Sequence, residues 1–507
     1  MSDNPYSGSA VKRSAGHFLV GKIVSALLTF TILLWLVRLL NVPDYATYVT
    51  LAVSLDMTLF ISGIGLPWME SRYLPEFRLH ASKTILIRFI VQLIQSQVAL
   101  LLLVAISAWL CLDWLLLKMN MTAYSEVVQL CLIMLVVDGT GRRLRDSTLS
   151  ALLQQGLAQI SLVIRNLLFI IALAILVYSG EVSLIHVITA DLLAASVSLL
   201  ISLVGLWRHL KRINISENPN WIAPKWSQMW AVARNMYFSS MVTQAYSSQV
   251  FTLIIRYNLG VEATAAFGFL RNLYSQVTSY LPATLLFGLI RPKLIASYVG
   301  DGGIVELTRN ANIIGKFSLF VLMPLLVFAW LMGEQLVAQL SGGKFPQSGY
   351  YLAGLLCAAI PLSQRQILET VAVLTGNSHL CNYASLLGIL TLPMAYGLIQ
   401  IGFDLWAPII ATALGNLLFC STIAKGVTKN TLYHADLLGY YKMLLAALLG
   451  YLASMLIIFP AQGWVSIIAV AILACCTFLL AAAIIKPFSE TERLRINQLI
   501  KRNLFIW

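Results

Sequence analysis

Charged side chains that interrupt long apolar runs are the groups in this sequence best suited to chemistry. Three arginines and four carboxylates lie inside such runs: Arg165, Arg271, Arg365, Asp56, Asp138, Asp191 and Glu369. A charge in the hydrocarbon of a membrane is costly, about 2.5–3.5 kcal/mol for an arginine at its centre. These groups must therefore face protein, water or a ligand, and such charges usually mark a substrate path or an ion pathway.

Sequence spacing alone can pair most of these charges. Residues four apart on a helix share a face, and neighbouring predicted helices can bring two further charges together. The possible pairs are Arg365 with Glu369, Asp138 and Asp146 with Arg142, and Arg165 with Asp191. For these groups a structural ion pair and a functional role both stay open.

Asp56 and Arg271 have no partner nearby in the sequence. Unpaired charges inside membrane segments usually line a functional cavity, so we expect these two to do so. Amide side chains lie beside or among the charges: Asn235, Gln244, Asn272, Gln364 and Gln366. They would suit hydrogen bonding to a sugar, but they could equally join neighbouring helices.

Motifs for catalysis, metal binding and nucleotide binding are missing from the sequence. The run "SGGKF" (341–345) lacks the spacing of a phosphate-binding loop, and neither H-E-x-x-H nor G-x-S-x-G occurs. The seven cysteines form no C-x-x-C pair. We therefore predict no catalytic residue, no metal site and no cofactor, and we expect the chain not to be an enzyme.

The elements that must hold these charges are membrane-spanning helices. Of 507 residues, 59% are hydrophobic and 11% are charged, whereas about a quarter of a soluble chain is charged. Apolar runs of about 20 residues, each long enough to cross a bilayer, recur throughout. We predict an all-α integral membrane protein with about 14 spans, near 16–40, 46–69, 84–108, 125–148, 156–178, 185–206, 227–256, 263–290, 311–333, 350–376, 380–402, 404–427, 437–459 and 463–486.

The distribution of lysine and arginine predicts the orientation of these spans. With the N-terminus in the cytoplasm, most of the 34 basic residues fall at cytoplasmic ends, among them Arg142, Arg143, Arg145 and Lys316. Four fall on the opposite side: Arg38, Lys118, Arg256 and Lys344. This positive-inside bias places both termini in the cytoplasm. The net charge of +13 suits an anionic inner leaflet and needs no nucleic acid partner.

A weak internal repeat predicts two lobes. "RLLNVPDYATY" begins at Arg38 and "RYNLGVEATAAF" begins at Arg256, and each joins two predicted spans. Two six-helix lobes in the same orientation would enclose a central cavity. We predict an N-terminal lobe over 1–215, a C-terminal lobe over 216–430, and two further helices with a cytoplasmic tail over 431–507.

Three short stretches resemble the polysaccharide transporters of the Wzx type. They are "WLVRLLNVPDYATYVTLAVSL" (35–55), "GIGLPWMESRYLPEF" (63–77) and "LGVEATAAFGFLRNL" (259–273). The Arg-Tyr-Leu-Pro-Glu order in the second stretch is typical of the exit from the second helix in this family. Asn41 and Ala46 depart from the pattern, because glycine is usual at both positions.

The resemblance implies the fold of the multidrug/oligosaccharidyl-lipid/polysaccharide (MOP) exporters, shared with MATE transporters and MurJ flippases. It also implies flipping of a polyprenyl-pyrophosphate-linked oligosaccharide from the cytoplasmic to the periplasmic leaflet. Such a flippase serves O-antigen, lipopolysaccharide or exopolysaccharide synthesis in the bacterial inner membrane. Its partners would be membrane lipids and the polymerase and export proteins of the same pathway.

By helix position, the resemblance implies that Lys22, Asp56 and Arg271 line the cavity. Further site residues are expected from their own place in the sequence. The groups expected to attract the pyrophosphate are Lys22, Arg271 and Arg365. Asp56 or Glu369 would bind a coupling H⁺ or Na⁺, and Glu70 with Arg72 would form a cytoplasmic gate.

Three other functions stay open. A small-molecule or drug exporter of the same superfamily would usually have 12 spans. A membrane glycosyltransferase or polymerase would need a larger external loop than residues 333–349 provide. A structural subunit of an export machine would carry no transport of its own.

Overall fold

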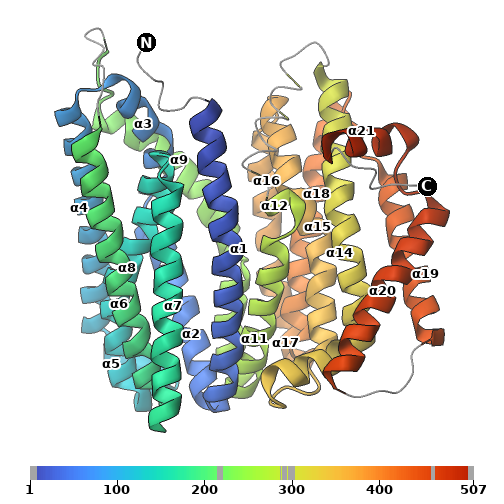
Figure 1. The fold of residues 1–507 in the computed structure, drawn as a ribbon, viewed down its shortest axis with the longest axis horizontal. Helices are drawn as coiled ribbons and strands as arrows, with labels where there is room; N and C mark the ends of the chain where they lie inside the picture. The colour runs from blue at the N-terminus through green and yellow to red at the C-terminus, as the bar shows by residue number, and fades with distance from the viewer. Residues whose placement is uncertain are drawn as a thin grey trace. The chain divides into compact units, whose positions relative to one another are not determined.

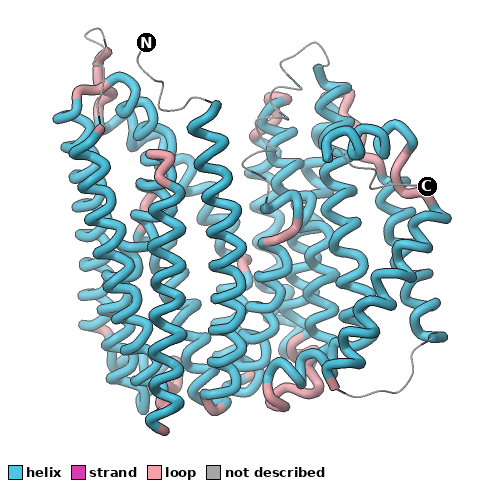
Figure 2. The backbone as a smooth tube through the Cα atoms, viewed as in Figure 1, coloured by secondary structure: helices cyan, strands magenta, loops and turns pink. Residues whose placement is uncertain are grey.

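Helices make up all the regular structure that the chain shows. The computed structural model describes residues 8–213, 221–285, 287, 294, 298, 303–457 and 463–500, and within these ranges every regular element is a helix (Figure 2). The predicted all-α class is therefore confirmed.

The chain divides into two compact units. One comprises Met1–Met241 with Leu259–Ala265, and the other comprises Val242–Asn258 with Ala266–Trp507. The predicted lobe boundary at 215 falls in residues 214–220, outside the described part.

The first unit is a bundle of long helices, labelled in Figure 1. Its elements are α1 (Gly8–Leu39), α2 (Val42–Ser62), α3 (Leu66–His80), α4 (Lys83–Leu110), α5 (Leu112–Lys118), α6 (Ser125–Arg143), α7 (Gln155–Ser179), α8 (Leu184–Arg212) and most of α9 (Trp226–Ala245). Helices α1 and α7, α7 and α8, α6 and α8, and α4 and α6 pack against one another. Asn41 caps α2, since its Oδ1 accepts from the Asp44 amide at 2.8 Å.

A π-helical turn extends α6. This turn, η2 (Leu144–Leu149), continues the helix without a break. Such turns are rare and often lie at functional sites. It places Arg145 and Thr148 on buried faces of the bundle.

The predicted span 46–69 is wrong in one respect, because the helix breaks after Ser62. Ile64 and Gly65 adopt φ values of 38° and 82°, which end α2 and allow α3 to start at Leu66. A Cβ on Gly65 would lie 2.7 Å from the carbonyl oxygen of Ala233. Pro75 lies inside α3, which continues to His80.

The second unit contains the remaining helices (Figure 1). They are α10 (Ser248–Asn258), α11 (Gly260–Ser279), α12 (Pro282–Leu285), α14 (Gly303–Ser341), α15 (Gly349–Leu374), α16 (His379–Ile389), α17 (Thr391–Gln400), α18 (Trp406–Asn430), α19 (Leu437–Ile457), α20 (Trp464–Ile485) and α21 (Glu490–Ile500). The first residues of α11 belong to the first unit. Helix α15 packs against α14 and α18, and α14 also contacts α19 and α20.

Eleven helices of the described part are long and apolar enough to cross a membrane. The predicted ranges 227–256, 263–290 and 350–376 are not among them, although helices occupy most of their described residues. Helix α15 is long enough at 26 residues, but its run from Gln364 to Glu369 makes it too polar. The chain is thus a multi-pass membrane protein.

Candidate functional site

A chain of ion pairs runs through the first unit. Asp138 on α6 lies at its centre, with Arg142 Nε at 2.6 Å and Arg165 Nε at 3.4 Å. Arg142 also reaches Asp56 on α2 at 2.8 Å, and Arg165 reaches Asp191 on α8 at 2.8 Å. With Arg145 on η2, 3.7 Å from Asp138, these six residues form what we call the charge network.

The helices fix the charge network from several sides. Asp138 and Arg142 are one helical turn apart, so their side chains meet on one face of α6. Arg145 is buried and donates from Nη1 to Ser198 Oγ on α8 at 2.8 Å. Three arginines face three aspartates, so the charge network is neutral, as buried charges require.

The residues of the charge network differ in how far their side chains are exposed. The side chains of Asp138, Asp191 and Arg165 are 4%, 7% and 13% exposed. Those of Arg142 and Asp56 are each 36% exposed. Arg142 and Asp56 are therefore the members of the charge network with the most exposed side chains.

Two pairs predicted from the sequence are present in the charge network, namely Asp138 with Arg142 and Arg165 with Asp191. Asp56 has no partner nearby in the sequence, and in the structure it pairs with Arg142, 86 residues away. Arg142 and Arg145, counted among the charges at cytoplasmic helix ends, both lie on helices of the bundle and contact Asp138. The contact of Arg145 with Asp138 was not predicted from the sequence.

Lys22 and Asp146 lie at the edge of this region. Lys22 is half-buried on α1 and interacts electrostatically with Asp146 on η2. Asp146 follows Arg145 directly in the chain, so Lys22 lies near the π-helical turn. The predicted role of Lys22 in substrate binding stays a prediction.

Glu70 and Arg72, expected to form a gate, point to different environments. Glu70 is fully buried on α3, whereas Arg72 is exposed and stacks on the ring of Tyr73. Glu70 accepts hydrogen bonds from Gln97 Nε2 and from Thr148 Oγ1, the latter at 2.9 Å. Burial raises the pKa of Glu70 to about 7, although the two hydrogen bonds and the nearby Arg143 oppose the rise. The structure does not bring the two gate residues together.

The second unit has its own charged cluster on α15. Arg365 Nε lies 3.1 Å from Glu369 Oε1, which confirms the pair predicted from their spacing. Arg365 Nη2 donates to Thr243 Oγ1 at 3.3 Å, and Arg365 Cζ lies 3.9 Å from the ring centre of Phe419. The Arg365 side chain is mostly buried, while that of Glu369 is 39% exposed. This cluster therefore also presents a carboxylate outward and holds an arginine behind it.

Arg271 is buried on α11. It is 8% exposed, and its Nη2 lies 3.4 Å from Asn272 Oδ1. The predicted contact with a substrate phosphate would need this side chain to become accessible. That role stays a prediction.

Lys316, counted among the cytoplasmic charges, is buried inside the second unit. It is 1% exposed on α14, and its Nζ lies 2.6 Å from Asp436 and 2.5 Å from Glu492. Asp436 precedes α19 and Glu492 lies on α21. Lys316 thus joins three segments of the chain, and we call this group the α21 latch.

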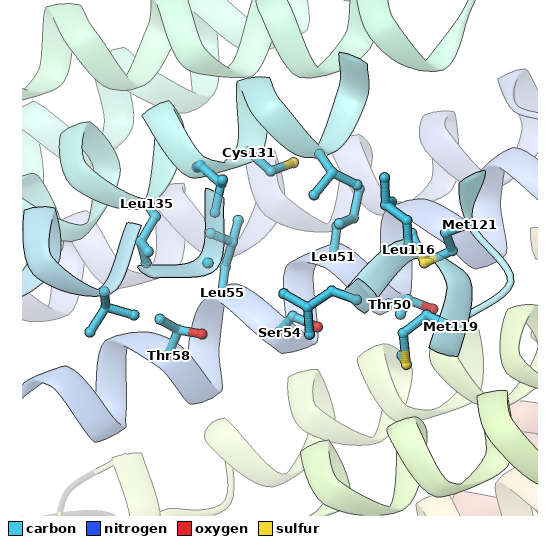
Figure 3. A pocket seen from close by; sticks show the side chains of 15 residues that line it. Thr50, Leu51, Ser54, Leu55, Thr58, Leu116, Met119, Met121, Cys131 and Leu135 are labelled. Atoms are coloured by element: carbon cyan, nitrogen blue, oxygen red, sulfur yellow. The ribbon is translucent and has the colours of Figure 1, made fainter. Parts of the chain in front are cut away.

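An apolar pocket of about 240 Å³ lies among α2, α4, α5 and α6 (Figure 3). Thr50, Ser54 and Thr58 line it from one face of α2. The other walls are mostly leucine and methionine side chains, with Cys131 among them. The pocket can take an apolar group, and it offers no charged side chain among those that line it.

No protein-family model matches the chain, and no curated protein matches it significantly. Solved structures do match it. A lipid II flippase MurJ in an inward closed conformation aligns at a TM-score of 0.72, with 10% identity, over 96% of this chain and 99% of that one. An inward-facing multidrug resistance MATE family transporter of the MOP superfamily aligns at 0.58, with 13% identity, over 82% of this chain and 98% of that one.

A mutant of the Vibrio cholerae MATE transporter VcmN aligns at a TM-score of 0.57 with 15% identity. That match covers 84% of this chain and 99% of the transporter. The chain therefore has the fold that MurJ and the MATE transporters share. The predicted MATE/MurJ-like fold is confirmed.

Proposed function

We propose that this chain is a flippase for a polyprenyl-pyrophosphate-linked oligosaccharide. It would move this lipid from the cytoplasmic to the periplasmic leaflet of a bacterial inner membrane by alternating access. The similar fold of the lipid II flippase MurJ supports the proposal. The observation that carries it is the partly exposed Arg142–Asp56 pair, because charges on membrane helices usually mark a substrate or ion pathway.

The charge network suggests how a pyrophosphate binds. Arg142 uses Nη1 for Asp56 and Nε for Asp138. A phosphate oxygen can replace Asp56 at Nη1, while Asp138 keeps the guanidinium in place. Arginine forms strong, charge-assisted hydrogen bonds with phosphate. Binding would thus exchange one anion for another without leaving a buried charge unpaired.

The same exchange offers a role for the coupling ion. When phosphate takes Arg142, the Asp56 carboxylate loses its counter-ion and can bind H⁺ or Na⁺. Glu369 would behave in this way if the substrate took Arg365. Release of the cation would then favour the return of each carboxylate to its arginine, which resets the site.

The cellular setting belongs to the same proposal. The bias of basic residues supports a multi-pass protein of the inner membrane with both termini in the cytoplasm. The substrate would come from cytoplasmic glycosyltransferases, and a polymerase and export proteins would use the flipped product. Lipopolysaccharide, O-antigen or exopolysaccharide synthesis would fit this order of steps.

The test begins with deletion of the gene and a search for lipid-linked glycan that accumulates in the cytoplasmic leaflet. Rescue is then compared for the wild type, Arg142→Ala, and the matched control Arg208→Ala on the exposed surface of α8. We expect the wild type and the control to restore surface polysaccharide and Arg142→Ala to fail at normal protein levels. Full rescue by Arg142→Ala would overturn the binding mechanism, and absence of accumulation would overturn the flippase.

Export of a small molecule is the second candidate, since the MATE transporters share the fold. The apolar pocket in the first unit favours it, because such a pocket would suit an apolar drug. A deletion strain that is sensitive to several apolar drugs, yet has normal surface polysaccharide, would support this alternative.

A further inference from the structure

Glu70 differs from the aspartates of the charge network in the groups that contact its carboxylate. Asp56, Asp138 and Asp191 each lie within 4 Å of an arginine nitrogen. Glu70 is fully buried, and its two oxygens accept from the neutral donors Gln97 and Thr148. A carboxyl group in such surroundings can be neutralised by a proton at little cost to its neighbours.

Arg143 is the charged group that faces Glu70. It is buried on α6, and its Nη2 donates to Ser62 Oγ at 3.0 Å and to the Leu59 carbonyl oxygen. Tyr237 on α9 is the titratable group that faces Arg143 in turn, and its hydroxyl donates to the Ile61 carbonyl oxygen at 2.8 Å. Arg143 therefore links the carboxyl group of α3 to the last turn of α2.

We propose that Glu70 is a proton-binding site that controls the break between α2 and α3. One proton from water would bind Oε2, the oxygen beside Thr148. That the bound proton is used for coupling rests on the proposed function, whereas the existence of the site does not.

Protonation needs little rearrangement of the hydrogen bonds. Thr148 now donates to Oε2, but a hydroxyl is both a donor and an acceptor. Once Oε2 carries the proton, the Thr148 oxygen can accept from it and turn its own hydrogen to a backbone carbonyl one turn earlier, as threonine in helices commonly does. Gln97 continues to donate to Oε1. Both states of the carboxyl group are therefore satisfied.

Protonation of Glu70 would affect the break between α2 and α3. Ionised Glu70 attracts Arg143, which holds the end of α2 through Leu59 and Ser62. Neutral Glu70 removes this attraction, so α2 and α3 are held less firmly across the positive-φ residues Ile64 and Gly65. The raised pKa of Glu70 would bring this change near neutral pH.

The test is infrared difference spectroscopy on the full-length purified protein without substrate, over a pH range of about 5 to 9. We expect a carboxylic acid band that appears with a midpoint near the pKa of about 7. Glu70→Gln should lose the band, while the matched control Glu262→Gln, at an exposed position on α11, should keep it. Thr148→Val removes a hydrogen bond that lowers the pKa, so it should move the midpoint upward.

Persistence of the band in Glu70→Gln, or a wild type without any band near neutral pH, would overturn the site. If Glu70→Gln fails to fold, an unmoved midpoint in Thr148→Val would overturn it instead. Because the measurement uses no substrate, a failed flipping assay leaves it intact, and the two proposals are tested separately. For coupling, Glu70→Gln in proteoliposomes should flip lipid at a rate that no longer responds to a proton gradient.

Discussion

Replacing Asp138 by asparagine should separate stability from transport in the charge network. The substitution keeps the shape of the side chain and removes its charge. Asp138 is almost fully buried and lies within 4 Å of three arginines. Its loss leaves Arg145 and Arg165 in the interior with less compensation.

The expected magnitude follows from burial. Removing one partner of a buried ion pair costs about 3–5 kcal/mol, because the other charge stays behind. The Asp56–Arg142 pair is 36% exposed on both sides, and exposed pairs contribute about 0–1 kcal/mol. Asp138→Asn should therefore lower the free energy of unfolding by several kcal/mol, whereas Asp56→Asn should barely change it.

The assay is unfolding by a titration with sodium dodecyl sulfate in mixed micelles, followed by circular dichroism. Transport is measured in the same preparations after reconstitution. We expect Asp138→Asn to shift the unfolding midpoint strongly, and Asp56→Asn to keep the midpoint but lose coupled transport. Equal unfolding midpoints for Asp138→Asn and the wild type would refute the claim that Asp138 neutralises the buried arginines Arg145 and Arg165.

Three further predictions concern other parts of the chain. Lys316→Met should lower the free energy of unfolding by about 3–5 kcal/mol and release α21. Proteolysis within 490–500 should then be faster, and unchanged cleavage would contradict this. Gly65→Ala should cost about 1–3 kcal/mol in thermal stability through positive-φ strain, while Gly397→Ala, with open space around it, serves as the control. Burial alone would raise the pKa of Asp436, but the Lys316 ammonium and the Gly439 amide keep it below its ordinary 3.8. The stabilisation by Asp436 is therefore present above about pH 4 and is lost as the pH falls through the lowered pKa, so protection of α21 in hydrogen exchange should decline only in strong acid.

Local regularities in the sequence predicted much of the fold. Apolar runs predicted the helices because a membrane segment must satisfy its backbone internally. Spacing by one helical turn predicted the Arg365–Glu369 and Asp138–Arg142 pairs. These features depend on residues close together in the chain, so the sequence contains the whole signal.

Features that depend on tertiary packing were missed. The pairing of Asp56 with Arg142 joins residues 86 apart, and sequence alone provides no register between their helices. Glu70 resembles a loop charge because Arg72 and Pro75 follow it closely, yet α3 folds inward and buries it. Two glycines, at 63 and 65, interrupt an apolar run in the sequence. The break after Ser62 also needs the close approach of Ala233 to Gly65, which the sequence does not reveal.

The α21 latch has a consequence for biogenesis. Lys316 is synthesised 176 residues before Glu492 and 120 residues before Asp436. During insertion, α14 therefore carries an ammonium group without these two carboxylates until the last helices have emerged from the ribosome. The second unit can reach its final packing only after α21 has been synthesised, so a chain that terminates within α20 should lack the Glu492 contact of Lys316 and be degraded faster than the full-length chain.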